Sequence, residues 1–257
     1  MSDSQSSIAI DVQNLTIGYG SHVLLQNLNF SVANGEIFVI LGGSGCGKSS
    51  LLKNLFGLYQ PLAGDVLIEG QNITTAVGAE RQKIMTSFGV MYQEGALFGS
   101  MNLLSNVTLF MEEYTQLTRP QMDLLARCKL DLVGLLPYES YMPSEISGGM
   151  QKRAAIARAM ALDPKILFLD EPSAGLDPIT SADLDRTIMD LSKNLGFTFV
   201  IVSHELASIY SIADKVIMLD KGAKGIIAEG DPKVLRDTSA DPRVHQFFNR
   251  IMSKEAA

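Results

Sequence analysis

The amino-terminal third of the chain is a series of short apolar runs separated by turn residues. Apolar and polar positions there have the spacing of β-strands, which we expect over Ala9–Leu15, Val23–Val32 (with a break near Asn27), Ile37–Leu41, Val66–Glu69 and Phe88–Tyr92. Ile37–Leu41 is apolar throughout, as in a strand that is covered on both faces. A glycine-rich loop follows this strand, and the pattern then predicts a helix over Ser49–Phe56.

Residues from about 94 to 160 have a different pattern. Leu and Met recur there at helical spacing, and Pro120, Pro137 and Pro143 interrupt the runs. We therefore expect a helical subdomain over about 94–160.

Strands and helices alternate in the rest of the chain. Strands are predicted over Ile166–Leu169, Thr198–Val202, Val216–Leu219 and Gly225–Ala228, and helices over Ile179–Asn194, Glu205–Ile212, Pro232–Arg236 and Pro242–Met252. Such alternation is typical of an α/β domain whose mostly parallel sheet is covered by helices. We expect this domain to span residues 8–240, followed by a short tail over 241–257.

Composition and charge exclude several classes of protein. The net charge of −7 disfavours a nucleic-acid-binding protein, since such domains usually present a basic face. We expect no signal peptide, because Met1–Ser7 is polar, and no membrane span, because no apolar run approaches about 18 residues. Cys46 and Cys128 cannot form a disulfide framework, which favours a reduced, intracellular protein. The 46% of hydrophobic residues beside only 19% of charged ones indicates a surface that partner subunits cover in part.

The loop after the apolar strand carries the first chemical motif. It fits the pattern G-x-x-x-x-G-K-[ST] through Gly42, Gly43, Ser44, Gly45, Cys46, Gly47, Lys48 and Ser49, with Ser50 next in the chain. Glycines let successive backbone N–H groups point at phosphate oxygens, and the following helix directs its positive end at the same anion. Lys48 supplies a point charge for the β- and γ-phosphates, and the Ser49 hydroxyl can ligate Mg²⁺. The motif predicts ATP and Mg²⁺ as ligands. Cys46 is interpreted either as a small filler of the loop or as a reactive thiol that nucleotide protects.

A second apolar strand, Ile166–Leu169, ends in two acids. In a parallel sheet the strand would carry Asp170 and Glu171 to the carboxyl edge, where ligands bind. Asp170 can hold Mg²⁺ through water, and Glu171 can act as general base towards an attacking water. The alternative is an ordinary strand that ends in acids at a solvated turn, and the phosphate loop in the same chain weighs against it.

Several further motifs together resemble the ABC ATPases. Ser147-Gly148-Gly149-Met150-Gln151 resembles their signature motif, and the run Asp170-Glu171-Pro172-Ser173-Ala174-Gly175-Leu176-Asp177 resembles their Walker B motif and D-loop. Gln93 is similar to the Q-loop glutamine, His204 to the switch histidine, and Tyr19 to the aromatic residue that stacks on adenine. The motifs follow the family's order between about residues 8 and 230. Each alone has a plainer alternative: a capped turn for the signature, a surface amide for Gln93, a structural histidine for His204 and a strand-end aromatic for Tyr19.

The resemblance implies a fold, a reaction and an assembly. The fold is a P-loop NTPase of the ABC ATPase type, with an antiparallel β subdomain beside the parallel sheet and the helical subdomain. The activity is ATP hydrolysis by a homodimer, in which the signature residues Ser147, Gly148, Gly149 and Gln151 of one copy contact the nucleotide of the other. Ser49, Gln93 and Asp170 would serve Mg²⁺, while Glu171, His204 and Lys48 would be catalytic.

Spacing narrows the class within the family. Only about fifty residues separate Gln93 from Ser147, which leaves no room for the long coiled coils of the DNA-repair relatives. The chain also has one ATPase domain, whereas translation-factor and antibiotic-resistance relatives have two. A separate subunit of a transporter is therefore favoured, with integral membrane permease subunits as partners, at the cytoplasmic face of the inner membrane as a peripheral protein.

Short segments resemble the ATPases of Mce-type phospholipid transporters. These segments are Gln93–Phe98, Met101-Asn102, Asn106-Val107, Met142–Met150, Asp177–Thr180, Asp241–Val244 and Gln246-Phe247. The resemblance implies phospholipid as cargo, with an Mce-domain protein and a small regulatory protein as further partners. Ala96, Leu97 and Phe98 would line a groove for a permease helix, unless they are ordinary packing residues. Glu94 departs from the group, which commonly has a small residue there. Two alternatives remain open: an importer of another small solute, and a regulator that dimerises on ATP without transport.

Overall fold

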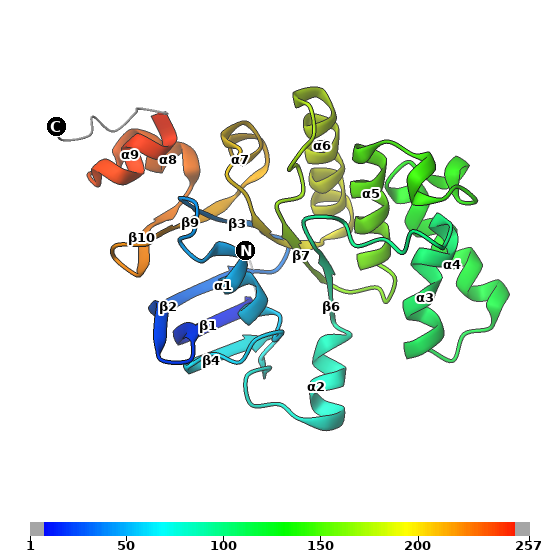
Figure 1. Cartoon of the computed structure of the whole chain (residues 1–257), viewed down its shortest axis with the longest axis horizontal. Coiled ribbons are helices and arrows are strands. Elements are labelled where there is room, and N and C mark those ends of the chain that lie inside the picture. The colour runs from blue at the N-terminus through cyan, green and yellow to red at the C-terminus, as the bar shows by residue number, and fades with distance from the viewer. Residues whose placement is uncertain (1–7, 250–257) are drawn as a thin grey trace, which may run out of the picture. The chain divides into compact units, whose positions relative to one another are not determined.

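The computed structural model describes residues 8–249, which divide into two compact units (Figure 1). The first unit contains the described residues up to Ala76 and those from Ile201 onwards. The second unit is Val77–Val200. No helix within residues 8–249 combines the length and the apolar character that a membrane crossing requires.

An antiparallel sheet forms one part of the first unit. Its strands are β1 (Ile8–Tyr19), β2 (His22–Ala33), β4 (Ala63–Ile68) and β5 (Gln71–Asn72), in the order β2-β1-β4-β5. The predicted break in the second strand is wrong, because β2 continues through Asn27. Asn27 takes a positive φ of 53° there, and the register with β1 shifts nearby, so the strand absorbs the irregularity as a bulge.

A second set of strands in the first unit carries the phosphate loop. β3 (Ile37–Gly42) pairs in parallel with β9 (Lys215–Asp220), and β9 pairs antiparallel with β10 (Gly225–Gly230). All six residues of β3 are buried, as the apolar run predicts. The helix α1 (Lys48–Leu55) follows the loop and buries Leu51, Leu52 and Leu55.

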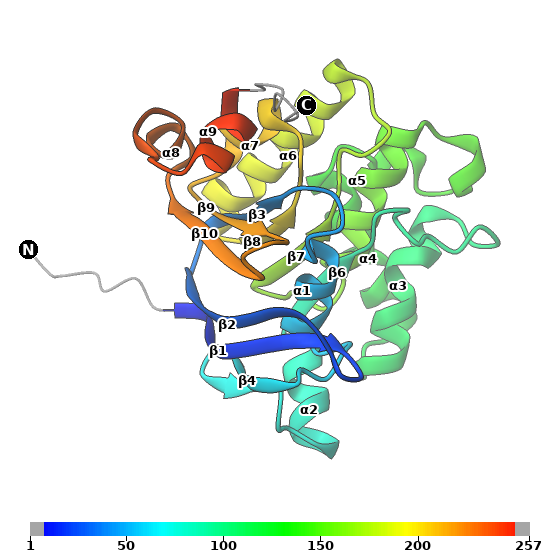
Figure 2. The ribbon, with the colours of Figure 1, turned by 60° about the vertical axis from the view of Figure 1, so that its left-hand side comes forward.

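Three more helices complete the first unit: α7 (Leu206–Ile212), α8 (Pro232–Thr238) and α9 (Pro242–Asn249). Figure 2 shows α8 and α9 beside α7. Val244 and Phe248 on α9 are buried, and the ring of Phe248 lies 5.9 Å from that of Tyr210 on α7. The predicted helix Pro242–Met252 is thus confirmed up to residue 249, and its last positions lie outside the described residues.

The second unit combines strands with a helical region. It contains α2 (Gly78–Met85), β6 (Phe88–Met91), α3 (Leu103–Tyr114), α4 (Arg119–Leu132), α5 (Gly148–Ala159), β7 (Ile166–Asp170) and α6 (Pro178–Leu195), while β8 (Thr198–Val202) falls at the boundary of the two units. β6 and β7 pair in parallel, and all five residues of β7 are buried. The helices α3, α4 and α5 pack on one another within the region of about 94–160 where a helical subdomain is predicted.

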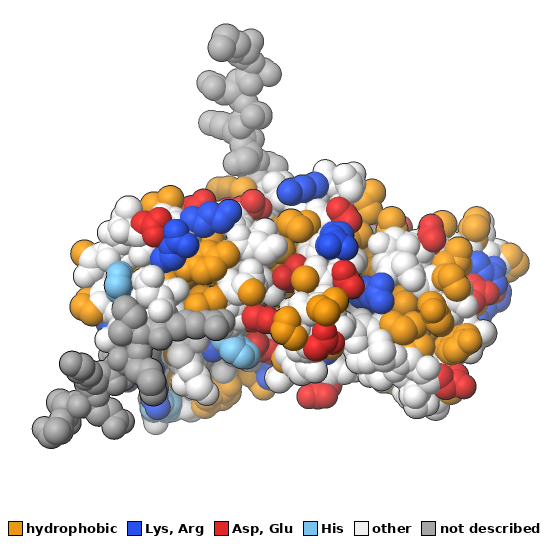
Figure 3. All heavy atoms as spheres, turned by 90° about the horizontal axis from the view of Figure 1, so that it is seen from above, with side chains coloured by type: hydrophobic (Ala, Val, Ile, Leu, Met, Phe, Trp, Pro, Cys, Tyr) orange, Lys and Arg blue, Asp and Glu red, His pale blue; other side chains and the backbone are white. Residues whose placement is uncertain are grey.

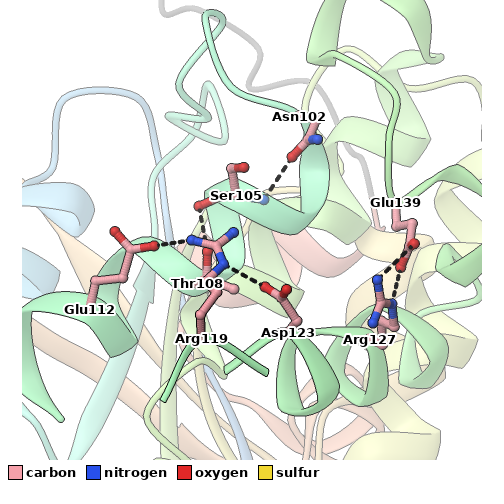
Figure 4. Close-up of polar contacts among 8 residues, drawn as sticks. All are labelled: Asn102, Ser105, Thr108, Glu112, Arg119, Asp123, Arg127 and Glu139. Carbon is pink, nitrogen blue, oxygen red and sulfur yellow. Dashed lines mark hydrogen bonds and ion pairs between the residues drawn. The ribbon is translucent and has the colours of Figure 1, made fainter. Parts of the chain in front are cut away.

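Ion pairs cross-link the helical region at its surface (Figure 4). Arg119, at the start of α4, bonds to Glu112 on α3 and lies 2.8 Å from Asp123 one turn further along its own helix. Arg127 on α4 lies 2.6 Å from Glu139. The arginines are half exposed, so each pair contributes at most about 1 kcal/mol to stability.

Candidate nucleotide-binding site

The predicted site residues fall in both units. Tyr19, the phosphate loop and His204 belong to the first unit. Gln93, the signature residues, Asp170 and Glu171 belong to the second.

The helix that follows the phosphate loop, α1, has no side-chain cap. Gly47 is the N-cap of α1, with a φ of 103° that only glycine adopts readily. No side chain caps α1 at Gly47, so no capping group stands between an anion and the start of the helix. The loop therefore has the backbone geometry of a phosphate site.

Close packing fixes the start of the loop. Gly42 has a φ of 146°, and a Cβ there would lie 2.5 Å from the carbonyl oxygen of Leu219. The Lys48 ammonium donates to the carbonyl oxygens of Gly42 and Gly43 at 2.8 and 3.1 Å. The lysine therefore lies folded over the loop, where a point charge serves phosphate oxygens.

Cys46 is a buried member of the loop. A Cβ on Gly42 would come within 2.6 Å of its sulfur, so the thiol fills space against the glycine. Burial raises the pKa of the Cys46 thiol, and Lys48 opposes that rise only in part. Both observations favour the interpretation of Cys46 as a filler over that of a reactive thiol.

Tyr19 lies at the end of β1 with an exposed ring. Its hydroxyl is 3.0 Å from the Ser50 hydroxyl, one residue beyond Ser49. The ring of Tyr59 meets it edge-on, with ring centroids 6.0 Å apart. An exposed aromatic face next to the phosphate loop is a surface on which a purine base can stack. No sequence motif indicates that Tyr59 supports Tyr19.

His204 follows β8 and is exposed. Its preceding residue is anchored, because the Ser203 N–H donates to the Ile40 carbonyl at 3.4 Å and the Ser203 hydroxyl accepts from the Glu205 N–H at 3.1 Å. Ile40 belongs to β3, the strand that leads into the phosphate loop. The hydrogen bonds of Ser203 thus fix the backbone next to His204, which lies just beyond the end of β8.

In the second unit, the two acids differ in their surroundings. Asp170 ends the buried strand β7 and is 7% exposed, whereas Glu171 begins the following turn and is half-buried. Glu171 has a φ of 49°, which is costly for a residue with a side chain. Its carbonyl accepts from the Ala174 N–H at 3.1 Å, which holds the turn. The backbone therefore directs the two carboxylates differently.

The signature motif forms the start of α5. Ser147 is the N-cap, and its hydroxyl accepts from the Met150 N–H at 3.3 Å. Gly149 lies so close to α6 that a Cβ would stand 2.2 Å from the Thr180 methyl group. The Gln151 amide donates to the Pro143 carbonyl at 2.9 Å, which ties the preceding turn to the helix.

One pocket in the second unit brings three predicted motifs together. Its volume is about 350 Å³, and its lining is Gln93, Glu94, Gly148, Gln151, Lys152, Ala174, Gly175 and Leu176. The Q-loop, the signature and the D-loop therefore meet at one place. The sequence predicted each motif, but it gave no indication that Lys152 joins them.

A family model settles what these motifs belong to. The model described as "ABC transporter" matches residues 25–174, which is more than half of the chain. The chain belongs to the ABC transporter family. It is accordingly an ATP-binding and ATP-hydrolysing subunit of the ABC type.

Curated relatives of this ABC ATPase cover nearly all of it. "Probable ribonucleotide transport ATP-binding protein mkl" of Mycobacterium leprae is 42% identical over 242 residues, which cover 94% of this chain and 69% of the relative. "Intermembrane phospholipid transport system ATP-binding protein MlaF" of Escherichia coli K12 is 38% identical over 242 residues, with 94% of this chain and 89% of the relative covered.

Solved structures of other ABC ATPases share the fold. CbiO1 from Clostridium perfringens, part of the ABC transporter complex cbiONQ, has a TM-score of 0.81 at 27% identity, with 96% of each chain covered. The ATP-binding cassette MJ0796, in a dimeric post-hydrolysis state bound to ADP and Pi, has a TM-score of 0.76 at 27% identity over 86% of this chain and 98% of that one. The α/β fold of an ABC ATPase, with parallel and antiparallel sheets, is thereby confirmed.

Proposed function

We propose that two copies of this ABC ATPase bind two Mg-ATP and drive a phospholipid transporter. The ATPase lies at the cytoplasmic face of the inner membrane as a peripheral subunit. The observation that carries the dimer is the pair of helix N-termini, one behind the phosphate loop and one behind Ser147. When two copies pair head to tail, each nucleotide lies between the phosphate loop of one copy and the signature helix of the other. Both anion sites of each chain are then used. The MJ0796 cassette, a dimer bound to ADP and Pi, supports this arrangement.

The phosphate loop binds the ATP phosphates. The backbone of Gly42–Ser50 faces the phosphate oxygens, and Lys48 exchanges its loop carbonyls for the β- and γ-phosphates. Tyr19 stacks on adenine, with the ring of Tyr59 supporting it from the edge.

Mg²⁺ would be held by Ser49, Gln93 and Asp170. The donors are a hydroxyl, an amide oxygen and a carboxylate, which is the oxygen chemistry that Mg²⁺ prefers. When bound, the ion neutralises charge on the β- and γ-phosphates.

Glu171 acts as general base in hydrolysis. Its carboxylate takes a proton from the water whose oxygen attacks the γ-phosphorus. The bond between the γ-phosphorus and the bridging oxygen breaks, and ADP leaves with that oxygen and the electron pair. His204 contacts the γ-phosphate side and stabilises the charge that develops there. In the other copy, Ser147, Gly148, Gly149 and Gln151 complete the enclosure of the same nucleotide.

A permease in the membrane is the main partner. Phe98 is 45% exposed, Ala96 is exposed and Leu97 is half-buried, so this turn offers apolar side chains to a permease helix. Figure 3 shows hydrophobic side chains gathered at its right-hand end, where Figure 1 places the helices of the second unit. Such a surface is suited to burial against another subunit.

Phospholipid is the proposed cargo because of a similarity that covers most of the chain and includes its motif segments. MlaF of E. coli is named for phospholipid transport and matches 94% of this chain, and the segments around Gln93 and Ser147 resemble Mce-type systems. An Mce-domain protein is therefore a further proposed partner. The relative mkl, which is named for ribonucleotide transport, makes ribonucleotide the second candidate cargo.

Affinity purification from membranes in mild detergent tests this proposal. The tagged full chain is recovered, and both proteins and extracted small molecules are identified by mass spectrometry. We expect a permease, an Mce-domain protein and phospholipid enriched over a Lys48→Ala control and over bulk membrane. A permease recovered with ribonucleotide or with a soluble solute-binding protein would reject the lipid cargo, and absence of any integral membrane chain would reject transport.

A further inference from the structure

We propose that Lys152 is a positioning residue for Gln93, and that it makes the Q-loop move as one piece with the signature helix α5. This inference rests on the proposed role of Gln93 at the Mg²⁺ site. Lys152 itself touches neither nucleotide nor metal in this proposal. It acts through the backbone of the residue that does.

Lys152 is a buried cation that bonds directly to the Q-loop. It lies on the first turns of α5, only 9% of it is exposed, and its ammonium donates to the Gln93 carbonyl oxygen. Burial lowers the pKa of Lys152, and the carboxylate of Glu94 opposes that effect. Both residues line the pocket that the Q-loop, the signature and the D-loop share. A buried ammonium costs much less when a carbonyl and a nearby carboxylate satisfy it, so the contact with Gln93 persists.

Arg158 makes a second bond from the same helix to the same loop. It is 6% exposed, and its guanidinium donates to the carbonyl oxygens of Ala96 and Gly95, the latter at 3.2 Å. The rings of Phe98 and Phe110 lie 6.0 and 5.9 Å from the guanidinium carbon, one from the loop and one from α3. Two cations, six residues apart on α5, therefore bond to three backbone carbonyls of the loop, those of Gln93, Gly95 and Ala96.

The loop itself is shaped to lie on the helix. Gly95 and Ala96 both have positive φ, 72° and 51°, and a Cβ on Gly95 would lie 3.4 Å from that of Ala155 on α5. Further on, the buried amide of Asn106 accepts from the Phe98 N–H at 2.7 Å and donates to the Phe98 carbonyl at 3.1 Å. The far end of the loop is thus fixed to α3.

A mechanical consequence follows from these bonds. The Gln93 carbonyl can shift only if Lys152 shifts with it or loses its acceptor, and the carbonyls of Gly95 and Ala96 are tied to Arg158 in the same way. Loss of either contact would leave a buried charge unpaired. A displacement of Phe98 by a docked partner would therefore reach both Gln93 and the signature through α5. Lys152 sets where the Gln93 backbone stands, and so where its amide oxygen can reach.

The test measures divalent-ion affinity with Mn²⁺ as the probe. Free Mn²⁺ is followed by electron paramagnetic resonance as it binds to the full chain with a non-hydrolysable ATP analogue. The variants are Gln93→Ala, Lys152→Met and Lys152→Arg, with Arg153→Met as the matched control, since Arg153 bonds to the Val133 carbonyl instead. The Mg²⁺ concentration for half-maximal ATP hydrolysis is measured on the same proteins.

We expect Gln93→Ala and Lys152→Met each to weaken Mn²⁺ binding by about 10- to 100-fold, on the scale of supporting residues around metal ligands. Lys152→Arg restores most of it, Arg153→Met leaves it unchanged, and Lys152→Met adds nothing in a Gln93→Ala background. If Lys152→Met does not fold, Lys152→Gln keeps an N–H donor for Gln93 and is expected to lie between wild type and Gln93→Ala.

Two results separate failure of this inference from failure of the proposed function. If Gln93→Ala weakens Mn²⁺ binding while Lys152→Met and Lys152→Gln leave it at the wild-type value, the positioning role of Lys152 is overturned. Additive losses in the double variant overturn it as well. If Gln93→Ala itself leaves Mn²⁺ binding unchanged, Gln93 is not part of the metal site and the proposed function is wrong at that residue.

Discussion

The helices α1 and α5 both begin at a glycine-rich motif that the proposed function assigns to phosphate, yet their first turns are built differently. α1 follows Gly47, which has a left-handed backbone and no side chain to cap the helix. α5 follows Ser147, whose own hydroxyl accepts from the Met150 N–H. The N-terminus of α1 thus has no side-chain cap, whereas that of α5 has one N–H group capped by its own serine.

The charges near the two helix starts differ in the same way. Lys48 lies on the first turn of α1 and bonds to carbonyls of its own loop, so it can be transferred to a phosphate. Lys152 and Arg158 lie further along α5 and are directed at the Q-loop carbonyls. The start of α1 thus carries a cation of its own first turn, whereas the cations of α5 are bonded to the Q-loop.

The largest expected effect comes from a change in the proposed base that leaves the N-termini of α1 and α5 as they are. Glu171→Gln leaves α1 and α5 intact but removes the proposed base, so hydrolysis should fall at least on the order of 10²-fold while ATP still binds. Phosphate release and equilibrium ATP binding measure the two quantities. Glu113→Gln, an exposed acid on α3, is the control. Turnover near wild type would remove Glu171 from the role of base.

Lys48→Ala tests the α1 terminus. A charge-assisted contact is worth about 1.5–3 kcal/mol, so the variant should lose ATP affinity by at least about 10- to 100-fold. Isothermal titration with ATP checks this. Lys53→Ala, on the last turn of the same helix, should bind ATP as wild type does. Unchanged affinity in Lys48→Ala would contradict the assignment of the phosphate loop.

Gly149→Ala tests how closely α5 packs at its start. The new methyl group would overlap the Thr180 methyl group, which stands 2.2 Å from a Cβ at position 149. Overpacking of this kind costs about 1–3 kcal/mol, to be measured as the loss of unfolding free energy in denaturant. Thr180→Ser removes that methyl group and keeps the hydroxyl that bonds to Asp177. It should therefore restore most of the stability, and no recovery would reject this contact as the cause.

Two substitutions at Ser147 distinguish its role as the cap of α5 from its proposed contact with nucleotide. Ser147→Ala should cost about 1 kcal/mol of stability and should also lower hydrolysis. Ser147→Asn supplies another good cap, so stability should return while hydrolysis stays low. Thermal melting and phosphate release measure the pair. If Ser147→Asn restores both, the hydroxyl matters only as a cap.

The smallest effect concerns a capped helix with no assigned ligand. Asp241 accepts from the Arg243 N–H at 2.8 Å at the start of α9, and hydrogen bonds from the Arg243 guanidinium lower the pKa of its carboxyl from 3.8 to about 2. Because the folded pKa is depressed, this stabilisation is present above pH about 4 and disappears as the pH falls towards 2. The stability difference between wild type and Asp241→Asn should vanish over that window. A difference independent of pH would contradict it.

Sequence reasoning reached the strands and the motifs because their signals are local. The apolar run before the phosphate loop gave β3, and the acids after Ile166–Leu169 marked the end of β7. The helix α2 was missed, since only Ile84 in it is buried and its polar residues have no periodic pattern. The sequence does not distinguish the bulge at Asn27 from a break in the strand, because Asn is common in turns and also adopts a positive φ.

The connections between motifs could not be predicted in the same way. Lys and Arg on a helix usually face solvent, and nothing local shows that the partners of Lys152 and Arg158 are carbonyls 59 and 62 positions away. The close approach of Gly149 to Thr180 likewise depends on the packing of α5 against α6. Such contacts arise only when the chain is folded, which is why they carry the new inference.

The central claim, that nucleotide pairs two copies of this ATPase, is tested most directly by native mass spectrometry. The Glu171→Gln chain is isolated from membranes with its partners in the presence of Mg-ATP, so that nucleotide is bound but not consumed. We predict complexes that contain two copies of the chain and two ATP. Complexes saturated with ATP that contain a single copy of the chain would contradict the claim.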